Sequence, residues 1–344
     1  MSHTVNKISD GVISGAEATR SKNLSPYLTV IAMFVYSVIA SAGVTWLAGS
    51  GSVIVVSAMA YFLTIYLYYG VAHMAYLRKT WLLWVGGGLA MLVGYLLSGI
   101  TGGWTLITGW SAILVSAALV GRLTQAGRRQ QRVYLYGLVA VIVFSILQFA
   151  PLWQDLMFAA SESVETMLTE AQQSLLTLGY GADAVRANVD RTRTMMNGLI
   201  RLLPAVTVLS VMMQFSIGYL IFTHLTGKKD QTVKRVAPFV FWKVPFAVTP
   251  VLIAAIVMRL FGGAAMVLAA DNILLILSVY YSVAGLALME FFLRKFNFSR
   301  LMKVLFYIMM FFSQMIGFFV AALLGFIDSF ADWRKTGRLG IAEE

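Results

Sequence analysis

The sequence predicts an all-α, polytopic membrane protein with about nine transmembrane helices, five before and four after an extracytoplasmic helical insert. Hydrophobic residues make up 59% of its 344 residues and charged residues only 12%, a composition far from that of soluble domains. Apolar runs of about 20 residues, long enough to cross the hydrocarbon core as helices, recur along the chain. The runs lack the alternating pattern of barrel strands, which leaves helices as the spanning structure.

The first part of the chain is predicted to form a tail and five membrane helices. Residues 1–26 are polar and are expected to be an N-terminal tail, and residues 27–153 form the first membrane half. Its apolar segments are Tyr27–Leu47, Val53–Leu77, Trp81–Leu97, Trp104–Val120 and Val133–Trp153. Ala40-Ser41-Ala42 resembles a signal-peptidase site, but the long apolar run around it favours a retained span.

Residues 154–197 are the only long polar stretch between apolar segments. Its apolar residues recur at helical spacing and indicate an amphipathic helix. They are Val164, Met167, Leu168, Ala171, Leu175 and Leu178. We expect this stripe to lie against the membrane helices or to cover their outer mouth.

The second membrane half is predicted over residues 198–327 and is followed by a tail, residues 328–344. Its four apolar segments are Leu202–Thr223, Val244–Leu260, Ala264–Leu293 and Leu301–Ile327. Nine spans would place the two ends of the chain on opposite sides of the membrane.

The distribution of basic residues predicts the orientation. Loops 78–79, 122–132, 228–243 and 294–303 hold fifteen lysines and arginines against one acid, whereas the alternate turns carry no charge. Basic loops face the cytoplasm, so we expect a bacterial inner-membrane protein with its N-terminus inside and the acidic insert outside. The same placement explains the net charge of +11 without a nucleic-acid partner.

Several classes of active site are excluded or disfavoured. The chain has no cysteine and only three histidines, which excludes thiol chemistry and Cys-based metal sites and leaves no His-rich metal cluster. No phosphate-binding loop, HExxH or GxSxG motif is present. We therefore expect no enzyme, no metal and no cofactor, and energy for transport would come from an ion gradient or a partner ATPase.

Asp271 is the sharpest candidate for a functional residue. It lies about seven residues into an apolar segment, or about 10 Å along a helix. A carboxylate at that depth needs a partner, water or a proton. Arg259 precedes the Gly262-Gly263 turn on the neighbouring segment and is the predicted partner. A structural ion pair, a neutral Asp271 and a transport or proton-relay role all remain open.

Other polar residues within apolar segments are weaker candidates. Asn272 and Gln214 could line a pathway, although such amides commonly link helices by hydrogen bonds. Tyr66, Tyr69 and His73 share one face of the second segment and could line a ligand cavity, or anchor that helix at the interface.

The C-terminal half contains residues that resemble a known family. These are Asp271-Asn272, Gly285-Leu286-Ala287-Leu288, Leu324-Gly325-Phe326-Ile327-Asp328-Ser329, Asp332 and Arg334. They resemble the YybS-like family of bacterial membrane proteins. The resemblance implies that the N-terminal half is similar to the substrate-binding components of energy-coupling-factor vitamin transporters.

Two hypotheses follow for the function. The first is a small-molecule transporter or substrate-capture component, with a cavity among the second to fifth segments and Asp271 as a gating or coupling charge. The second is a membrane scaffold or assembly factor whose insert binds another envelope protein. The expected partners are the lipid bilayer, a small-molecule substrate, and a membrane-protein partner or a second copy of the chain.

The orientation can be tested with reporter fusions. We expect a reporter after Gly179 to be extracytoplasmic and reporters at Gln130, Lys229 and Asn297 to be cytoplasmic, because basic loops are retained inside. Alkaline phosphatase and green fluorescent protein fusions at each site provide the measurement. A cytoplasmic Gly179 fusion would contradict the whole orientation.

Overall fold

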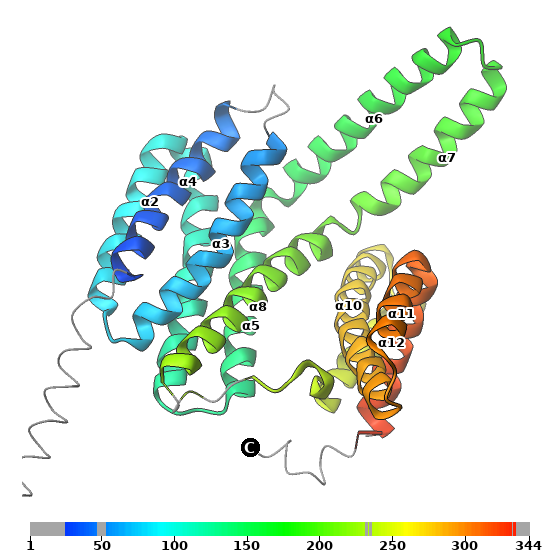
Figure 1. The fold of residues 1–344 in the computed structure, drawn as a ribbon. Helices are drawn as coiled ribbons and strands as arrows, with labels where there is room; N and C mark the ends of the chain where they lie inside the picture. The colour runs from blue at the N-terminus through cyan, green and yellow to red at the C-terminus, as the bar shows by residue number, and fades with distance from the viewer. Residues whose placement is uncertain (1–24, 47–52, 231–232, 234–235, 332, 335–344) are drawn as a thin grey trace, which may run out of the picture. The chain divides into compact units, whose positions relative to one another are not determined.

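A computed structural model describes residues 25–46, 53–230, 233, 236–331 and 333–334, without the side chains of residues 25, 40–46, 53–57, 98–106 and 314. These residues form eleven α-helices and three short 3-10 helices, and no strand occurs among them (Figure 1). Five helical stretches in this part of the chain are long and apolar enough to span a membrane. The predicted all-α membrane fold is confirmed.

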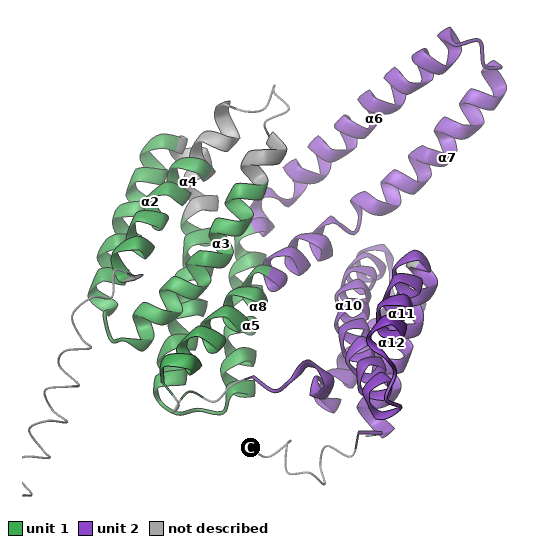
Figure 2. Ribbon diagram, in the orientation of Figure 1, with its two compact units in different colours: residues 1–148, 214–234 green, residues 149–213, 235–344 purple. Residues whose placement is uncertain are grey.

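The chain divides into two compact units, which are described separately (Figure 2). Unit 1 comprises residues 1–148 and 214–234, and unit 2 comprises residues 149–213 and 235–344. Helix α8 (Leu203–Lys229) begins in unit 2 and ends in unit 1.

Unit 1 is built around helix α3 (Val53–Tyr76). Its other members are α2 (Ser25–Trp46), α4 (Thr80–Gln125), α5 (Gln130–Phe149) and the second part of α8. Glycines allow close approach to α3: a Cβ on Gly70 would lie 2.6 Å from the Thr29 side chain of α2, and one on Gly218 of α8 would lie 2.5 Å from Tyr68 Cβ. A Cβ on Gly121 of α4 would overlap the Ala72 carbonyl oxygen. Three helices therefore pack on α3 at nearly backbone distance.

Helix α4 contains both the third and the fourth predicted segments. It is helical over 46 residues, and a straight helix of that length would place Gly87 and Leu114 about 40 Å apart. A Cβ on Gly87 would instead lie 2.8 Å from Leu114 Cδ1, so the chain folds back on itself between them. The reversal falls where the sequence predicts the turn at residues 98–103.

The insert of unit 2 is a hairpin of α6 (Trp153–Thr177) and α7 (Ala182–Ile200), which follows a short 3-10 turn at Ala150–Leu152 (Figure 1). Gly179 ends α6 with φ of 85°, a conformation that glycine adopts without strain.

The predicted apolar stripe has a different partner from the one expected. Leu168 of α6 packs against Val185 and Val189 of α7. The expectation that the whole stripe lies against the membrane helices was wrong, because α7 supplies the covering surface. Met167 and Leu178 do not join the contact and are 67% and 73% exposed.

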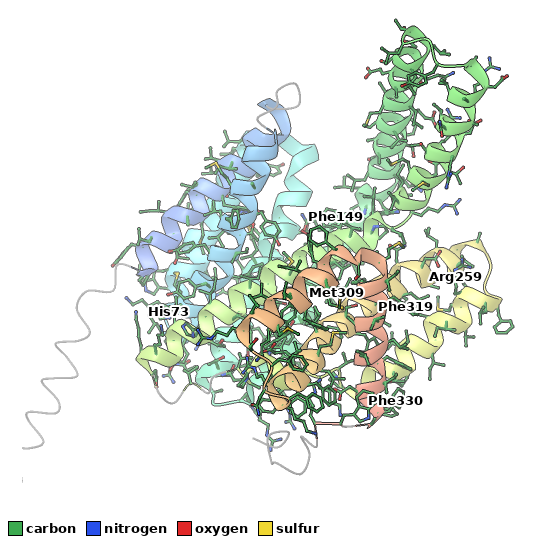
Figure 3. All side chains as sticks on the ribbon, turned by 45° about the vertical axis from the view of Figure 1, so that its right-hand side comes forward. His73, Phe149, Arg259, Met309, Phe319 and Phe330 are labelled. Atoms are coloured by element: carbon green, nitrogen blue, oxygen red, sulfur yellow. The ribbon has the colours of Figure 1, made fainter. Side chains whose placement is uncertain are left out.

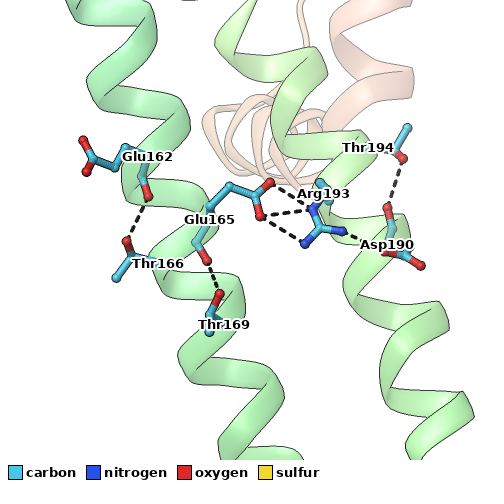
Figure 4. A network of polar contacts seen from close by, with 7 residues as sticks. All are labelled: Glu162, Glu165, Thr166, Thr169, Asp190, Arg193 and Thr194. Atoms are coloured by element: carbon cyan, nitrogen blue, oxygen red, sulfur yellow. Dashed lines mark hydrogen bonds and ion pairs between the residues drawn. The ribbon is translucent and has the colours of Figure 1, made fainter.

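An ion-pair network fixes the register of this hairpin (Figure 4). Arg193 Nε lies 2.9 Å from Glu165 Oε1, and its Nη1 lies 2.9 Å from Asp190 Oδ1. The hydrogen bonds to Glu165, and secondarily its negative charge, raise the pKa of Arg193 above its ordinary value. Because Arg193 stays charged, a fall in pH weakens the network by protonating Glu165 and Asp190, and salt weakens it by screening these exposed charges.

The predicted segment Val244–Leu260 is helical only in its second part. Phe239–Phe241 and Phe246–Val248 form 3-10 turns, and helix α9 starts at Thr249 and ends at Phe261. Pro245 lacks the amide hydrogen that a longer helix would use there, and Pro250 is tolerated because it lies in the first turn. The resulting 13-residue helix is about 20 Å long, shorter than the hydrocarbon core.

The predicted ninth span is not one helix. Helices α11 (Arg300–Phe312) and α12 (Gln314–Ala331) are bent by 111° at Ser313. Figure 3 shows the bend between Met309 and Phe319, with Phe330 towards the far end of α12. The bend brings Gly317 to the Met310 carbonyl, where a Cβ would lie only 2.6 Å away.

The direction of α12 changes the expected position of the C-terminus. Ser282 of α10 (Ala264–Lys295) donates a hydrogen bond to the Phe318 carbonyl, and the Phe292 and Trp333 rings are 6.3 Å apart. From the first pair to the second, the residue number rises along both helices, so α12 runs parallel to α10. The expectation of one continuous ninth helix was therefore wrong, and Trp333 lies at the Lys295 end of unit 2. The side of the membrane on which the chain ends stays a prediction.

A reporter after Glu344 tests whether the bent pair of α11 and α12 is re-entrant. Since α12 runs parallel to α10, we expect the reporter to lie on the same side of the membrane as a reporter at Asn297. The fusion after Gly179 serves as the control for the opposite side. A C-terminal reporter on the Gly179 side would restore the single ninth span.

Candidate functional site

Asp271 and Arg259 form the predicted ion pair. Arg259 Nε of α9 lies 2.6 Å from Asp271 Oδ1 of α10, across the Gly262-Gly263 turn. Figure 3 labels Arg259 close to this turn. Both side chains remain partly exposed, so the pair is not sealed inside the protein. The predicted pairing is confirmed, and a role in transport stays a prediction.

Asn272 is a structural residue in this arrangement. Its Oδ1 accepts a hydrogen bond of 2.8 Å from the Ala205 amide in the first turn of α8. Its Nδ2 donates to the carbonyls of Arg201, at the end of α7, and Leu268. The side chain thus satisfies an orphan amide at the start of a helix, as an N-cap residue would. Backbone groups therefore bind both the side-chain oxygen and the side-chain nitrogen of Asn272.

The predicted face of Tyr66, Tyr69 and His73 is present on α3. The Tyr66 and Tyr69 rings are 6.1 Å apart, and the Tyr69 and His73 rings stack at 5.8 Å with an interplanar angle of 14°. His73 is only 4% exposed. Neither of its ring nitrogens has a hydrogen-bond partner among the described residues. Buried polar groups are nearly always paired, so this imidazole needs an explanation.

Gln214 lies half-buried on α8, where the chain passes into unit 1. It precedes Phe215, whose ring contacts Tyr68 of α3 and Tyr134 of α5. A role for Gln214 in a transport pathway stays a prediction.

The family-motif glycines are packing residues. A Cβ on Gly285 would overlap the Ala321 carbonyl, and one on Gly325 would overlap the Tyr281 carbonyl. They allow α10 and α12 to cross with their backbones in contact. A larger residue at either position would force these helices apart.

Asp328 and Arg334 form a completely enclosed ion pair. Arg334 Nη2 lies 2.5 Å from Asp328 Oδ2, and both side chains are inaccessible to solvent. Arg334 Nη1 also donates to the Val240 carbonyl at 2.6 Å, which ties the end of α12 to the turn before α9. This pair is a structural clamp. Asp332, the remaining motif residue, lies outside the described residues.

Glu290 lies in a second ion cluster of unit 2. Its Oε1 is 2.6 Å from Arg294 Nε, one helical turn away, and 3.9 Å from Lys303 Nζ. The Tyr307 hydroxyl of α11 also donates to Glu290, a contact that the sequence does not indicate. The cluster fixes α11 beside α10.

Sequence reasoning missed the polar contact at the end of α3 in unit 1. The Tyr76 hydroxyl at the end of α3 donates a hydrogen bond to Asp230, directly after α8. The only signal in the sequence is that Asp230 is the single acid in a basic loop. Tyr76 lies three residues after His73, so it belongs to the same end of α3.

One comparison with known proteins identifies the family of the chain. A family model described as "Predicted membrane protein (DUF2232)" matches residues 74–329. The chain belongs to this family. The match includes Asp271, Gly285, Gly325 and Asp328 but not His73. Comparison with the curated proteins and with the solved structures gives no match.

The described residues contain no group of three His, Asp or Glu side chains that could hold a metal ion. Within them, buried side-chain oxygens without a hydrogen-bond partner occur in both units, among them Asp328 Oδ1 in unit 2 and the Thr124 hydroxyl in unit 1. His73 differs from these because both of its ring nitrogens lack a partner and it shares its face of α3 with Tyr66 and Tyr69. The face of α3 that carries His73 is therefore the candidate binding site.

A double-mutant cycle tests the Asp271–Arg259 pair. We expect Asp271→Asn and Arg259→Gln each to lower thermostability in detergent, and the double variant to lose less than the sum, because each single change strands a charge. The coupling energy should be about 0.5–3 kcal/mol. Arg300→Gln, an exposed residue of α11, is the control. Additive losses would show that the pair contributes nothing.

Proposed function

We propose that this integral membrane protein captures or transports a small molecule, and that the substrate binds along the α3 face formed by Tyr66, Tyr69 and His73. The observation that carries the proposal is the buried His73 imidazole, which has no hydrogen-bond partner in the described part of the chain. Burial of an unpaired polar group costs about 1–3 kcal/mol. A bound molecule that hydrogen-bonds to the imidazole would recover that energy. A histidine with a purely structural role would be expected to have its hydrogen-bond partners within the protein.

The surroundings of α3 support a binding role. Tyr69 stacks on His73 and offers an aromatic surface, and Tyr66 continues the same face. Close packing at Gly70, Gly121 and Gly218 holds the helix in place, which favours a preformed site. The resemblance to substrate-binding components of energy-coupling-factor transporters points to the same half of the chain.

The proposed location is the bacterial inner membrane, with the N-terminus in the cytoplasm and the α6–α7 hairpin outside. It rests on the basic loops, which alternate with neutral or acidic ones. Asp271 and Arg259 would then lie near the outer face, as a gating or coupling charge pair.

A scaffold or assembly factor is the second candidate, and the α6–α7 hairpin favours it. Phe158 and Met167 on α6 and Tyr180 at the tip are 71%, 67% and 61% exposed, beyond the contact of Leu168 with α7. Exposed large apolar residues outside a membrane are typical of protein interfaces. In this reading the hairpin would hold another envelope protein.

Retention of a small molecule distinguishes the two functions. The full-length protein and the variants His73→Phe and His224→Phe would be purified in lipid nanodiscs, and extracted molecules measured by mass spectrometry. We expect one compound to accompany the wild type and the His224→Phe control, whose substituted histidine is exposed. Its amount should fall at least about tenfold in His73→Phe, which corresponds to the loss of one or two hydrogen bonds.

Equal retention by the wild type and His73→Phe would exclude the His73 face of α3 as the binding site. A photo-crosslinker at Tyr180 provides the complementary measurement. One defined protein product at Tyr180, together with no retained compound, would establish the scaffold in place of the transporter.

A further inference from the structure

Helix α6 carries a second stripe of uncharged residues beside the one that contacts α7. Val164, Leu168 and Leu175 lie in the contact with α7, and the second stripe contains the residues directly before them. Its members lie three or four residues apart, which is the spacing of one helix face. They are Leu156, Ala160, Ser163, Met167, Ala171 and Ser174. Ala160 is half-buried and the other members are exposed.

Helix α7 carries a matching stripe. The residues directly before its two buried valines, Val185 and Val189, are exposed and begin a second face of this helix. The members of this face are all exposed and again lie three or four residues apart. They are Ala184, Asn188, Arg191, Met195 and Leu199.

The two exposed stripes lie on the same side of the hairpin. On both helices the exposed stripe precedes the contact residues by one position, which is a rotation of roughly 100° about the helix axis. Because α6 and α7 face each other and run in opposite directions, this shared offset moves both stripes to one side. We call this side the open face. The Ser163 and Ser174 hydroxyls on it donate to carbonyls of their own helix, so a partner can cover them without leaving them unpaired.

Two charged residues of opposite sign lie at the edges of the open face. Glu170 is one helical turn from Met167 on the side of α6 away from α7, and Arg191 belongs to the stripe of α7. The Glu165–Arg193 pair sets the register, so Met167, two residues further along α6, lies level with Arg191 (Figure 4). Neither Glu170 nor Arg191 makes an ion pair with another residue in the described part of the chain.

We propose that the open face binds the same face of a second copy of this chain, so that two hairpins form an antiparallel four-helix bundle. Copies in one membrane have the same orientation, so the two-fold axis that relates them runs along the membrane normal. Helix α6 of one copy then lies against α7 of the other and runs antiparallel to it. Glu170 of one copy comes within reach of Arg191 of the other.

Charge complementarity favours this pairing of helices. Helix α6 contains four acidic residues and no basic one, whereas α7 contains three arginines and two aspartates. Contact of α6 with α6 of the second copy would oppose like charges, whereas contact with α7 joins opposite ones. A second copy therefore supplies the complementary charge without any further protein.

The size of the open face is sufficient for a weak dimer. At 25 and 19 residues, α6 and α7 are about 37 Å and about 28 Å long. Two adjacent helices, each about 10 Å wide, would thus bury roughly 600 Å² per copy. A standard interface buries about 800 Å² per partner.

The proposed dimer does not rest on the α3 site, because the hairpin belongs to unit 2 and α3 to unit 1. It differs from the scaffold function in its occupant. A second copy on the open face would leave other exposed apolar residues of the hairpin, such as Phe158 and Tyr180, for another envelope protein.

Disulfide crosslinking in membranes between two full-length copies with different tags tests the interface. The chain has no cysteine, so Ser174→Cys in one copy and Ala184→Cys in the other create a single reactive pair. The register places these positions level with each other on the open face. We expect a product that carries both tags. Leu176→Cys with Ala184→Cys should give none, because Leu176 lies roughly 200° around α6 from Ser174.

Substitutions on the open face test its contacts. We expect Met167→Glu to lower the crosslinked fraction at least about tenfold, since each dimer buries two copies of this side chain. Arg191→Glu should also lower it, and the addition of Glu170→Arg should restore it, because the reversed charges attract each other again. Leu176→Glu, on the opposite face of α6, should leave the fraction unchanged.

No product from the Ser174→Cys and Ala184→Cys copies would overturn the proposal, as would a product that Met167→Glu does not reduce. A stronger product between two Ser174→Cys copies would place α6 against α6 and would also overturn it. If Met167→Glu does not fold, failure of Glu170→Arg to restore the Arg191→Glu protein decides against the dimer.

Discussion

Lipid tails are as apolar as leucine, so helices in a membrane gain little from hiding their side chains and gain more from close backbone approach. In unit 1 this approach occurs where Gly70, Gly121 and Gly218 place α2, α4 and α8 against α3. In unit 2, Gly285 and Gly325 do the same for α10 and α12. The positions of the polar side chains follow from these contacts, because they determine which turns of neighbouring helices meet.

The buried polar groups fall into two kinds. Asn272 completes the start of α8, and Asp328 and Arg334 clamp the end of α12; each has partners within the protein. His73 has none among the described residues. Groups of the first kind stabilise one arrangement of helices, whereas a group of the second kind gains a partner only when something binds or the helices move. For this reason His73 on α3 is a better candidate for ligand binding than Asp271, whose charge is paired with Arg259.

Local features of the chain were predicted well. The bounds of α3 and α10 agree with the apolar runs to within a few residues, and the Asp271–Arg259 pair follows from its short separation across Gly262-Gly263. The bend at Ser313 could not be predicted, because an apolar run looks the same whether it crosses the membrane or turns back.

Contacts between residues far apart in the sequence could not be predicted either. Asn272 bonds to residues about 70 positions away, and Tyr76 and Asp230 are 154 positions apart. A single sequence contains no pattern that pairs such residues. The candidate site was therefore predicted only as a face of one helix, without the partners that distinguish its histidine from an anchoring residue.

The short α9 has a consequence for the bilayer itself. A helix of about 20 Å faces a hydrocarbon core of about 30 Å, and lipids respond to such hydrophobic mismatch by thinning around the protein. Headgroups and water would be drawn inward beside α9, next to Arg259 at its end. Local thinning of the membrane would therefore allow water to hydrate the Arg259–Asp271 pair. The length of the lipid chains would change how deep this pair lies in the bilayer.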